Sequence, residues 1–115
     1  MLLPKRKLGQ KGEQLAKKHL QSKGYLFIAA NFHTRFGEID LIFQDGDQLV
    51  FVEVKTRSTT DKGLPEEAIT PRKISHLKKA IDFFYLENPE LPRYARIDAV
   101  SITKDHIKHI QNISQ

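Results

Sequence analysis

One segment constrains the fold of this chain more than any other. The stretch from Gln48 to Lys55, QLVFVEVK, has apolar residues at five of its eight positions, four of them consecutive. Such a run is typical of a strand buried on both faces, at the centre of a sheet covered by helices. Because side chains alternate along a strand, Glu53 and Lys55 are expected on one face with Leu49 and Phe51. Charges at the end of a buried strand need partners, so this strand also marks a candidate site.

Local patterns on either side of this strand predict the remaining elements. Apolar residues at helical spacing predict a helix from Lys5 to Lys23, and Gly24 ends it. A second helix is predicted from Pro71 to Asn88, with Thr70 as its N-cap. Extended segments are predicted at residues 25–30, 35–43, 48–55 and 96–102, with a short one around 107–110. The order α-β-β-β-α-β-β indicates a single α/β domain over residues 1–115, with a mixed sheet flanked by helices.

The connection between residues 43 and 48 determines which acids can meet. Its Asp45-Gly46 step predicts an antiparallel hairpin. If the loop holds an even number of residues, Asp40 projects on the same face as Glu53. Glu13 lies at the margin of the buried stripe of the first helix and could approach the same place, or could be a partly exposed edge residue.

The expected group of Asp40, Glu53 and Glu13 is rich in oxygen donors, which suit Mg²⁺ or Mn²⁺. Buried carboxylates must be paired, protonated or bound to metal. Lys55 would neutralise one of them and orient a water molecule for attack on a phosphodiester. These four residues are the predicted catalytic residues, and the three acids are the predicted metal ligands. A structural salt bridge among the same residues is the alternative.

The distribution of charge favours an anionic partner. The net charge is +5, and eight acids against four bases gather in residues 33–67 of a chain that is otherwise basic. Nucleic acid is therefore the expected partner. The absence of cysteine excludes disulfides and thiolate zinc sites. No segment approaches the roughly 20 apolar residues of a membrane span, and the apolar run at the start is too short for a signal peptide. A cytoplasmic location without membrane contact is therefore expected.

Other polar residues carry weaker expectations. Arg35 and Arg57 could contact phosphates or could be solvated strand ends, and Lys73 could reach the site, a phosphate or only solvent. Glu38 is expected on the opposite face of its strand from the site. His106 and His109 have no third ligand nearby in the sequence, which favours a surface role over zinc binding.

Three blocks of sequence resemble a known family. They are G-x-x-G-E-x-x-A at residues 9–16, R-x-G-E-I-D-L-I at 35–42 and F-V-E-V-K-T-R at 51–57, and residues 67–70, 73 and 96–98 extend the likeness over nearly the whole chain. The sequence resembles the YraN-like family of uncharacterised proteins, which is considered part of the PD-(D/E)XK nuclease superfamily and is similar to archaeal Holliday junction resolvases. The resemblance implies a restriction-endonuclease-like fold. It also implies that Asp40, Glu53 and Lys55 are the motif residues and Glu13 the helical glutamate.

Three functions are consistent with these observations. The first is a metal-dependent endonuclease that hydrolyses phosphodiester bonds in DNA, and the resolvase resemblance suggests branched or junction DNA. The second is a catalytically inactive nucleic-acid-binding module with the same fold. The third is a homodimeric scaffold that uses Leu2, Leu3 and the aromatic end of the second helix at its interface.

Overall fold

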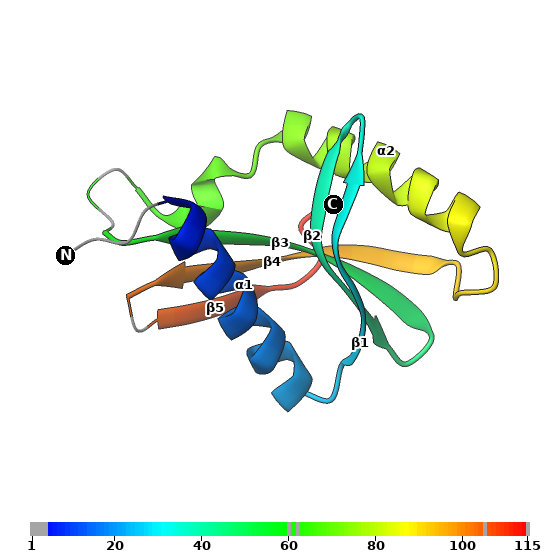
Figure 1. Cartoon of the computed structure of the whole chain (residues 1–115), viewed down its shortest axis with the longest axis horizontal. Coiled ribbons are helices and arrows are strands. Elements are labelled where there is room, and N and C mark those ends of the chain that lie inside the picture. Colours follow the sequence, from blue (N-terminus) through cyan, green and yellow to red (C-terminus); the bar gives the residue numbers. More distant parts are fainter. Residues whose placement is uncertain (1–4, 60, 62, 105, 115) are drawn as a thin grey trace.

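The structure of the chain is a computed structural model that describes residues 5–59, 61, 63–104 and 106–114. Its elements in order are α1 (Lys5–Ser22), β1 (Leu26–Thr34), β2 (Gly37–Asp45), β3 (Gln48–Arg57), the short 3-10 helix η1 (Pro65–Ala68), α2 (Pro71–Glu87), β4 (Tyr94–Thr103) and β5 (His106–Ile110) (Figure 1). The predicted order α-β-β-β-α-β-β is confirmed, with η1 added before α2. Leu2 and Leu3 of the predicted interface lie outside the described residues.

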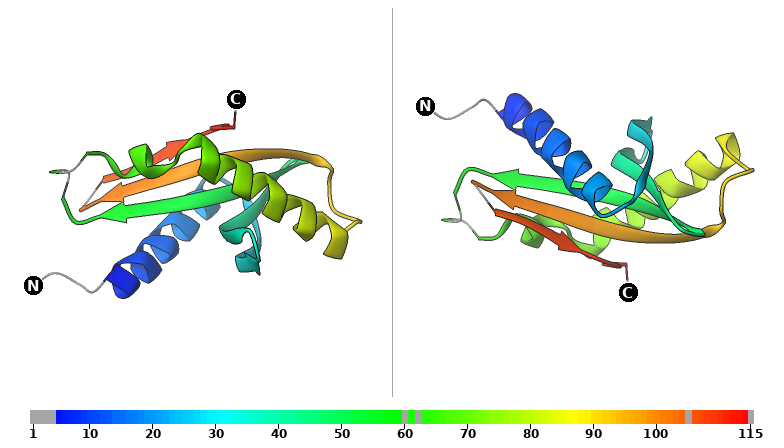
Figure 2. Two further views of the ribbon diagram at one scale, coloured as in Figure 1. Left: turned by 90° about the horizontal axis from the view of Figure 1, so that it is seen from above. Right: turned by 90° about the horizontal axis from the view of Figure 1, so that it is seen from below.

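The five strands form one mixed sheet in the order β1-β2-β3-β4-β5, and β3 occupies its centre as predicted. Among the described strands, only the β3–β4 pair is parallel, and η1 and α2 form the crossover between these two strands. The two helices lie on opposite sides of the sheet (Figure 2). Each covers one half of the core: Val50 and Val52 pack with α1, whereas Leu49 and Phe51 pack with α2. The alternating side chains of β3 therefore contribute to both cores.

The β2–β3 hairpin has the even loop on which the predicted site depends. Asp45 pairs with Gln48, so Gly46 and Asp47 form a two-residue loop. Gly46 has a φ of 63°, a conformation that glycine adopts without the steric cost of a side chain.

The start of α2 and the end of α1 agree with the predicted capping residues. The backbone N–H of Lys73 donates to Thr70 Oγ1 at 3.2 Å, and Pro71 is the first residue of α2. Gly24 follows α1 with a φ of 91°. Within the described part of the chain, neither helix is long and apolar enough to cross a membrane.

The outer end of the β1–β2 pair, residues 31–39, which we call the β1–β2 arm, is longer than the sequence predicts. β1 was expected to end at residue 30, but it continues to Thr34 through Asn31, whose φ is 53°. Thr34 then closes the turn, because its Oγ1 donates to the carbonyl of Gly37 and accepts the N–H of Phe36. This extension is half exposed, and its residues Asn31, His33 and Thr34 are polar whereas Phe32 is apolar. Such a mixed pattern predicts a strand less strongly than an apolar run does.

Candidate functional site

The site forms where β2 separates from β3, a place that we call the fork. Pairing between these strands runs from the hairpin loop to Leu41 opposite Val52. Asp40 comes next, and its Oδ2 accepts the backbone N–H of Val54 at 2.8 Å. Ile39 and Ile42 both pack into the core beneath α2 although they are three residues apart, so β2 rotates at Asp40. The β1–β2 arm consequently turns away from the sheet, as Figure 1 shows.

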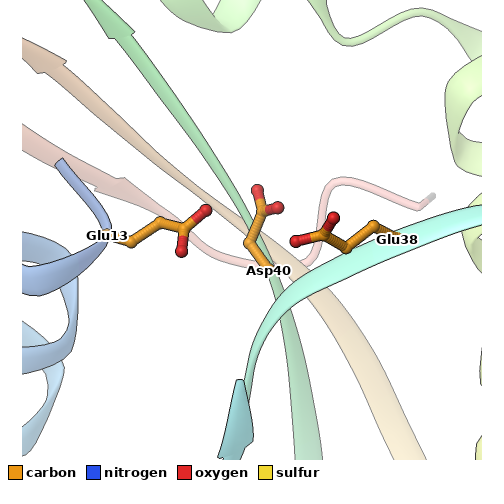
Figure 3. Close-up of side chains that lie close together, drawn as sticks. All are labelled: Glu13, Glu38 and Asp40. Carbon is orange, nitrogen blue, oxygen red and sulfur yellow. The ribbon is translucent and has the colours of Figure 1, made fainter. Parts of the chain in front are cut away.

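Three carboxylates converge at the fork. Glu13 of α1, with Glu38 and Asp40 of β2, each bring an oxygen within 4.8 Å of the other two (Figure 3). The side-chain amide of Asn31 donates to Glu13 Oε1 at 3.0 Å and to Glu38 Oε1 at 2.6 Å, so it holds two of the acids together. Among the described residues, Glu13, Glu38 and Asp40 are thus the acids close enough to share a metal ion. We call them the acid trio.

The expectation for Glu38 was wrong. It was placed on the opposite face of its strand, but it lies with Asp40 in the acid trio. Residues two apart in a strand point to the same side, so the spacing of Glu38 and Asp40 in the sequence already contained this information. The trio therefore has Glu38 where Glu53 was expected.

Glu53 lies beside the trio and is buried, with 3% of its surface exposed. Its Oε1 is 3.6 Å from Lys55 Nζ and 3.5 Å from Lys73 Nζ. Of the alternatives for Lys73, the structure shows the one in which its side chain reaches the site. Glu53 Oε2 is buried and has no hydrogen-bond partner among the described residues.

Burial raises the pKa of two acids at the fork, Asp40 and Glu53, and repulsion between carboxylates adds to the rise at Asp40. Burial, followed by the charge of Glu53, raises the pKa of Asp40 to about 7 in spite of the hydrogen bond from Val54. Burial also raises the pKa of Glu53, although Lys73 and Lys55 oppose that change. Four carboxylates therefore share this place with two ammonium groups. When all four carboxylates are ionised they exceed the two ammonium groups in charge, and a cation could neutralise this excess.

The other two predicted nucleic-acid contacts, Arg35 and Arg57, form no ion pair with the trio among the described residues. Arg35 is exposed at the end of the β1–β2 arm, with its guanidinium 5.0 Å from the ring centre of Phe36. Arg57 is the half-buried last residue of β3. Phosphate contacts of these two residues stay predictions.

The surface role expected for His109 was wrong, whereas His106 is exposed as expected. The side chain of His109 is 2% exposed, and its Nε2 lies 2.7 Å from Asp98 Oδ2. Asp98 is fully buried in β4 and also accepts hydrogen bonds from Arg96 and from the N–H of Asn112. A carboxylate inside an apolar strand needs such partners. The position of Asp98 in an apolar segment was therefore the signal in the sequence that could have indicated a buried partner such as His109.

The fold and the site define a class of protein. It is a small mixed α/β domain with carboxylates and lysines gathered at the fork, where β2 separates from the central strand β3. The chain matches the family described as "Uncharacterised protein family UPF0102" over residues 12–102. It belongs to this family, which confirms the YraN-like resemblance at the level of the family.

Its relatives cover almost the whole chain. A "UPF0102 protein" of Syntrophomonas wolfei subsp. wolfei is 49% identical over 111 residues, which are 93% of this chain and 96% of that protein. Another, from Carboxydothermus hydrogenoformans, is 42% identical over 113 residues, or 95% and 96% of the two chains. A third, from Persephonella marina, is 38% identical over 104 residues, or 90% of each.

Proposed function

We propose that this protein is a metal-dependent endonuclease of the PD-(D/E)XK superfamily that hydrolyses phosphodiester bonds in DNA. The observation that carries the proposal is the convergence of Asp40, Glu13 and Glu38 beside Glu53 and its two lysines at the fork. The order of Asp40, Glu53 and Lys55 along the paired strands β2 and β3 is the arrangement that the resemblance to that superfamily implies.

The residues present fit a divalent cation. All the donors are carboxylate oxygens, the ligands that Mg²⁺ and Mn²⁺ prefer. Glu53 Oε2 is a buried acceptor without a partner among the described residues, a state that costs about 1–3 kcal/mol or more for a charged group. Glu13, Glu38 and Asp40, which lie close enough together to share one ion, would hold it, with Glu53 beside them as an additional carboxylate. When bound, such an ion would polarise a phosphodiester oxygen and lower the pKa of a water molecule.

The protein's own residues would position the reacting groups. The side chain of Lys55 is 33% exposed, so its ammonium group can meet a substrate while it remains beside Glu53. There it would orient the attacking water and stabilise the charge that develops on the phosphate. Lys73 supplies a second positive charge near the same carboxylate. Val54 N–H and the Asn31 amide are positioning groups, because they hold the carboxylates of Asp40, Glu13 and Glu38 in place.

The choice of DNA rests on charge and on resemblance. A net charge of +5 in a chain that has eight of its fourteen acids in residues 33–67 favours a polyanionic partner. The likeness to archaeal Holliday junction resolvases favours branched DNA. A homodimer would offer two copies of the site to a junction with two symmetric strands.

Incubation with labelled linear, flapped and four-way DNA, in Mg²⁺, Mn²⁺ or EDTA, tests this function. We expect cleavage with either metal, no cleavage in EDTA, and loss of cleavage in Lys55→Ala. The matched control is Lys78→Ala, which removes an exposed lysine of α2. Binding of these DNAs without cleavage in any metal would contradict the nuclease and favour the inactive binding module.

A further inference from the structure

A second polar and aromatic cluster lies at the end of the β1–β2 arm. Phe36 in the turn packs against Phe83 of α2, with ring centres 5.7 Å apart and ring planes inclined by 36°. The Arg35 guanidinium lies 5.0 Å from the centre of the Phe36 ring and 5.8 Å from that of Phe83. Lys79 Nζ lies 5.2 Å from the Phe36 ring. We call Arg35, Phe36, Lys79 and Phe83 the aromatic tip.

The aromatic tip borders an open hollow of about 420 Å³. Arg35 and Phe83 line it, together with Phe32, His33, Thr34 and Glu87. A flat ring that entered this hollow could therefore meet an aromatic side chain and a guanidinium group. Both kinds of side chain stack on nucleobases, and the contact tolerates any base because every base has a π-face.

A line of residues joins the aromatic tip to the fork. Phe36 also borders a small second hollow that is lined by Glu38 of the acid trio and by Lys73 and His76 of α2. Residues 73, 76, 79 and 83 are spaced by three, three and four, so they follow one face of α2. With a rise of about 1.5 Å per residue, Phe83 lies about 15 Å along the helix axis from Lys73. A short stretch of nucleic acid can span that distance.

We propose, on the basis of the proposed function, that the aromatic tip binds an unpaired nucleobase of the substrate strand. The phosphates of that strand run past Lys79, His76 and Lys73 toward the acid trio. In a duplex the faces of each base are covered by its neighbours, so a paired base cannot enter the hollow and stack on Phe83, which Phe36 packs against. The substrate class is therefore DNA with unpaired nucleotides next to the bond that is cut, such as a single strand or the strand at a branch.

Binding measured in EDTA separates this proposal from cleavage. Fluorescence anisotropy of a fluorescein-labelled oligothymidylate and of a blunt duplex is compared for the parent, Phe36→Leu and Phe83→Leu. Leucine keeps the apolar bulk and removes the ring. We expect affinity for the single strand to fall by about five-fold or more in each variant, while affinity for the duplex stays unchanged. The matched control is Arg93→Gln, which removes a guanidinium from over a different ring, that of Tyr85, and should leave both affinities unchanged.

Equal single-strand affinity in the parent and both phenylalanine variants would overturn the proposal. So would equal losses for single strand and duplex, because a structural role of the rings would weaken both. An oligonucleotide with one 2-aminopurine tests the parent protein directly, independently of how the variants fold. Stacking should quench its fluorescence on binding, and bound probe without quenching would contradict the proposal.

The outcome for the catalytic proposal is separate. If the parent binds no single strand but cleaves duplex DNA in Mn²⁺ through Lys55, the aromatic tip proposal fails and the nuclease stands. If the ring variants lose single-strand binding and no DNA is cleaved in any metal, the base-binding site stands and the nuclease fails.

Discussion

Replacement of Asp40 by asparagine should stabilise the metal-free protein, which is unusual for a largely buried position. Asparagine keeps the shape of the side chain and can still accept the N–H of Val54 through its carbonyl oxygen. It removes one of the four carboxylates that repel one another at the fork. The variant should therefore lose electrostatic strain and little packing.

The size of this gain follows from the pKa of Asp40. In the unfolded chain an aspartate has a pKa of about 3.9, and each unit of difference corresponds to about 1.36 kcal/mol. A folded-state pKa of about 7 therefore corresponds to about 4 kcal/mol of lost stability once the group is fully ionised. The hydrogen bond from Val54 is stronger to a carboxylate than to an amide, so we expect a net gain of about 1–3 kcal/mol.

The gain should depend on pH in a defined direction. Between about pH 4 and pH 7 the folded protein holds more protons than the unfolded chain, so the stability of the parent falls as pH rises. The asparagine of the variant does not titrate, so the stability of the variant lacks the part of this decrease that Asp40 causes. The two proteins should be nearly equal in stability below about pH 4 and differ most above about pH 7.

Urea unfolding in EDTA at several pH values measures this difference. The matched control is Asp98→Asn, another buried aspartate. Burial alone would raise the pKa of Asp98, but hydrogen bonds from His109, Asn112 N–H and Arg96 lower it. Its charge is therefore stabilising above about pH 4, and the control should lose about 3–5 kcal/mol there because Arg96 is left without its full partner. If Asp40→Asn loses a similar amount above about pH 7, Asp40 is part of a structural ion pair and the reasoning is refuted.

Substitutions at three further positions, two of them with a control variant, test the framework of the fold. Gly12→Ala should cost about 1–3 kcal/mol in thermal melts, since an added Cβ would lie 2.7 Å from Thr56 Cγ2 and Oγ1; a variant as stable as the parent would contradict this contact. Thr70→Ala should lower the free energy of unfolding by about 1 kcal/mol through loss of the α2 N-cap. Thr70→Ser, which keeps the hydroxyl group, should retain most of the stability of the parent. His109→Ala should cost about 1–3 kcal/mol because a buried carboxylate loses a partner, whereas His106→Ala should stay within about 0.5 kcal/mol; equal effects would contradict the different burial.

The elements that the sequence predicts best are those set by local chemistry. The apolar run of β3, the Asp45-Gly46 loop and the Thr70-Pro71 start of α2 each depend on neighbouring residues, and each was confirmed. The even loop then placed Asp40 near Glu53 through simple alternation. The helical spacing of α1 brought Glu13 to the same place.

Features that depend on distant parts of the chain were missed. The contact of His109 with Asp98 requires β5 to pair with β4, and residue spacing alone does not specify that register. The rotation of β2 at Asp40, which opens the fork, accompanies the packing of both Ile39 and Ile42 against the distant helix α2. Glu38 is different, because its spacing of two residues from Asp40 was enough to predict that the two side chains lie on the same face of β2.

A calorimetric titration of Mn²⁺ into the metal-free protein tests the central claim most directly, namely that the acids at the fork hold a divalent cation. The matched control is Asp47→Asn, which removes an exposed carboxylate from the β2–β3 loop. We predict saturable binding in the parent and in Asp47→Asn, and loss of most of the affinity in Asp40→Asn. Absence of saturable binding in the parent, or equal affinity in Asp40→Asn, would contradict the claim.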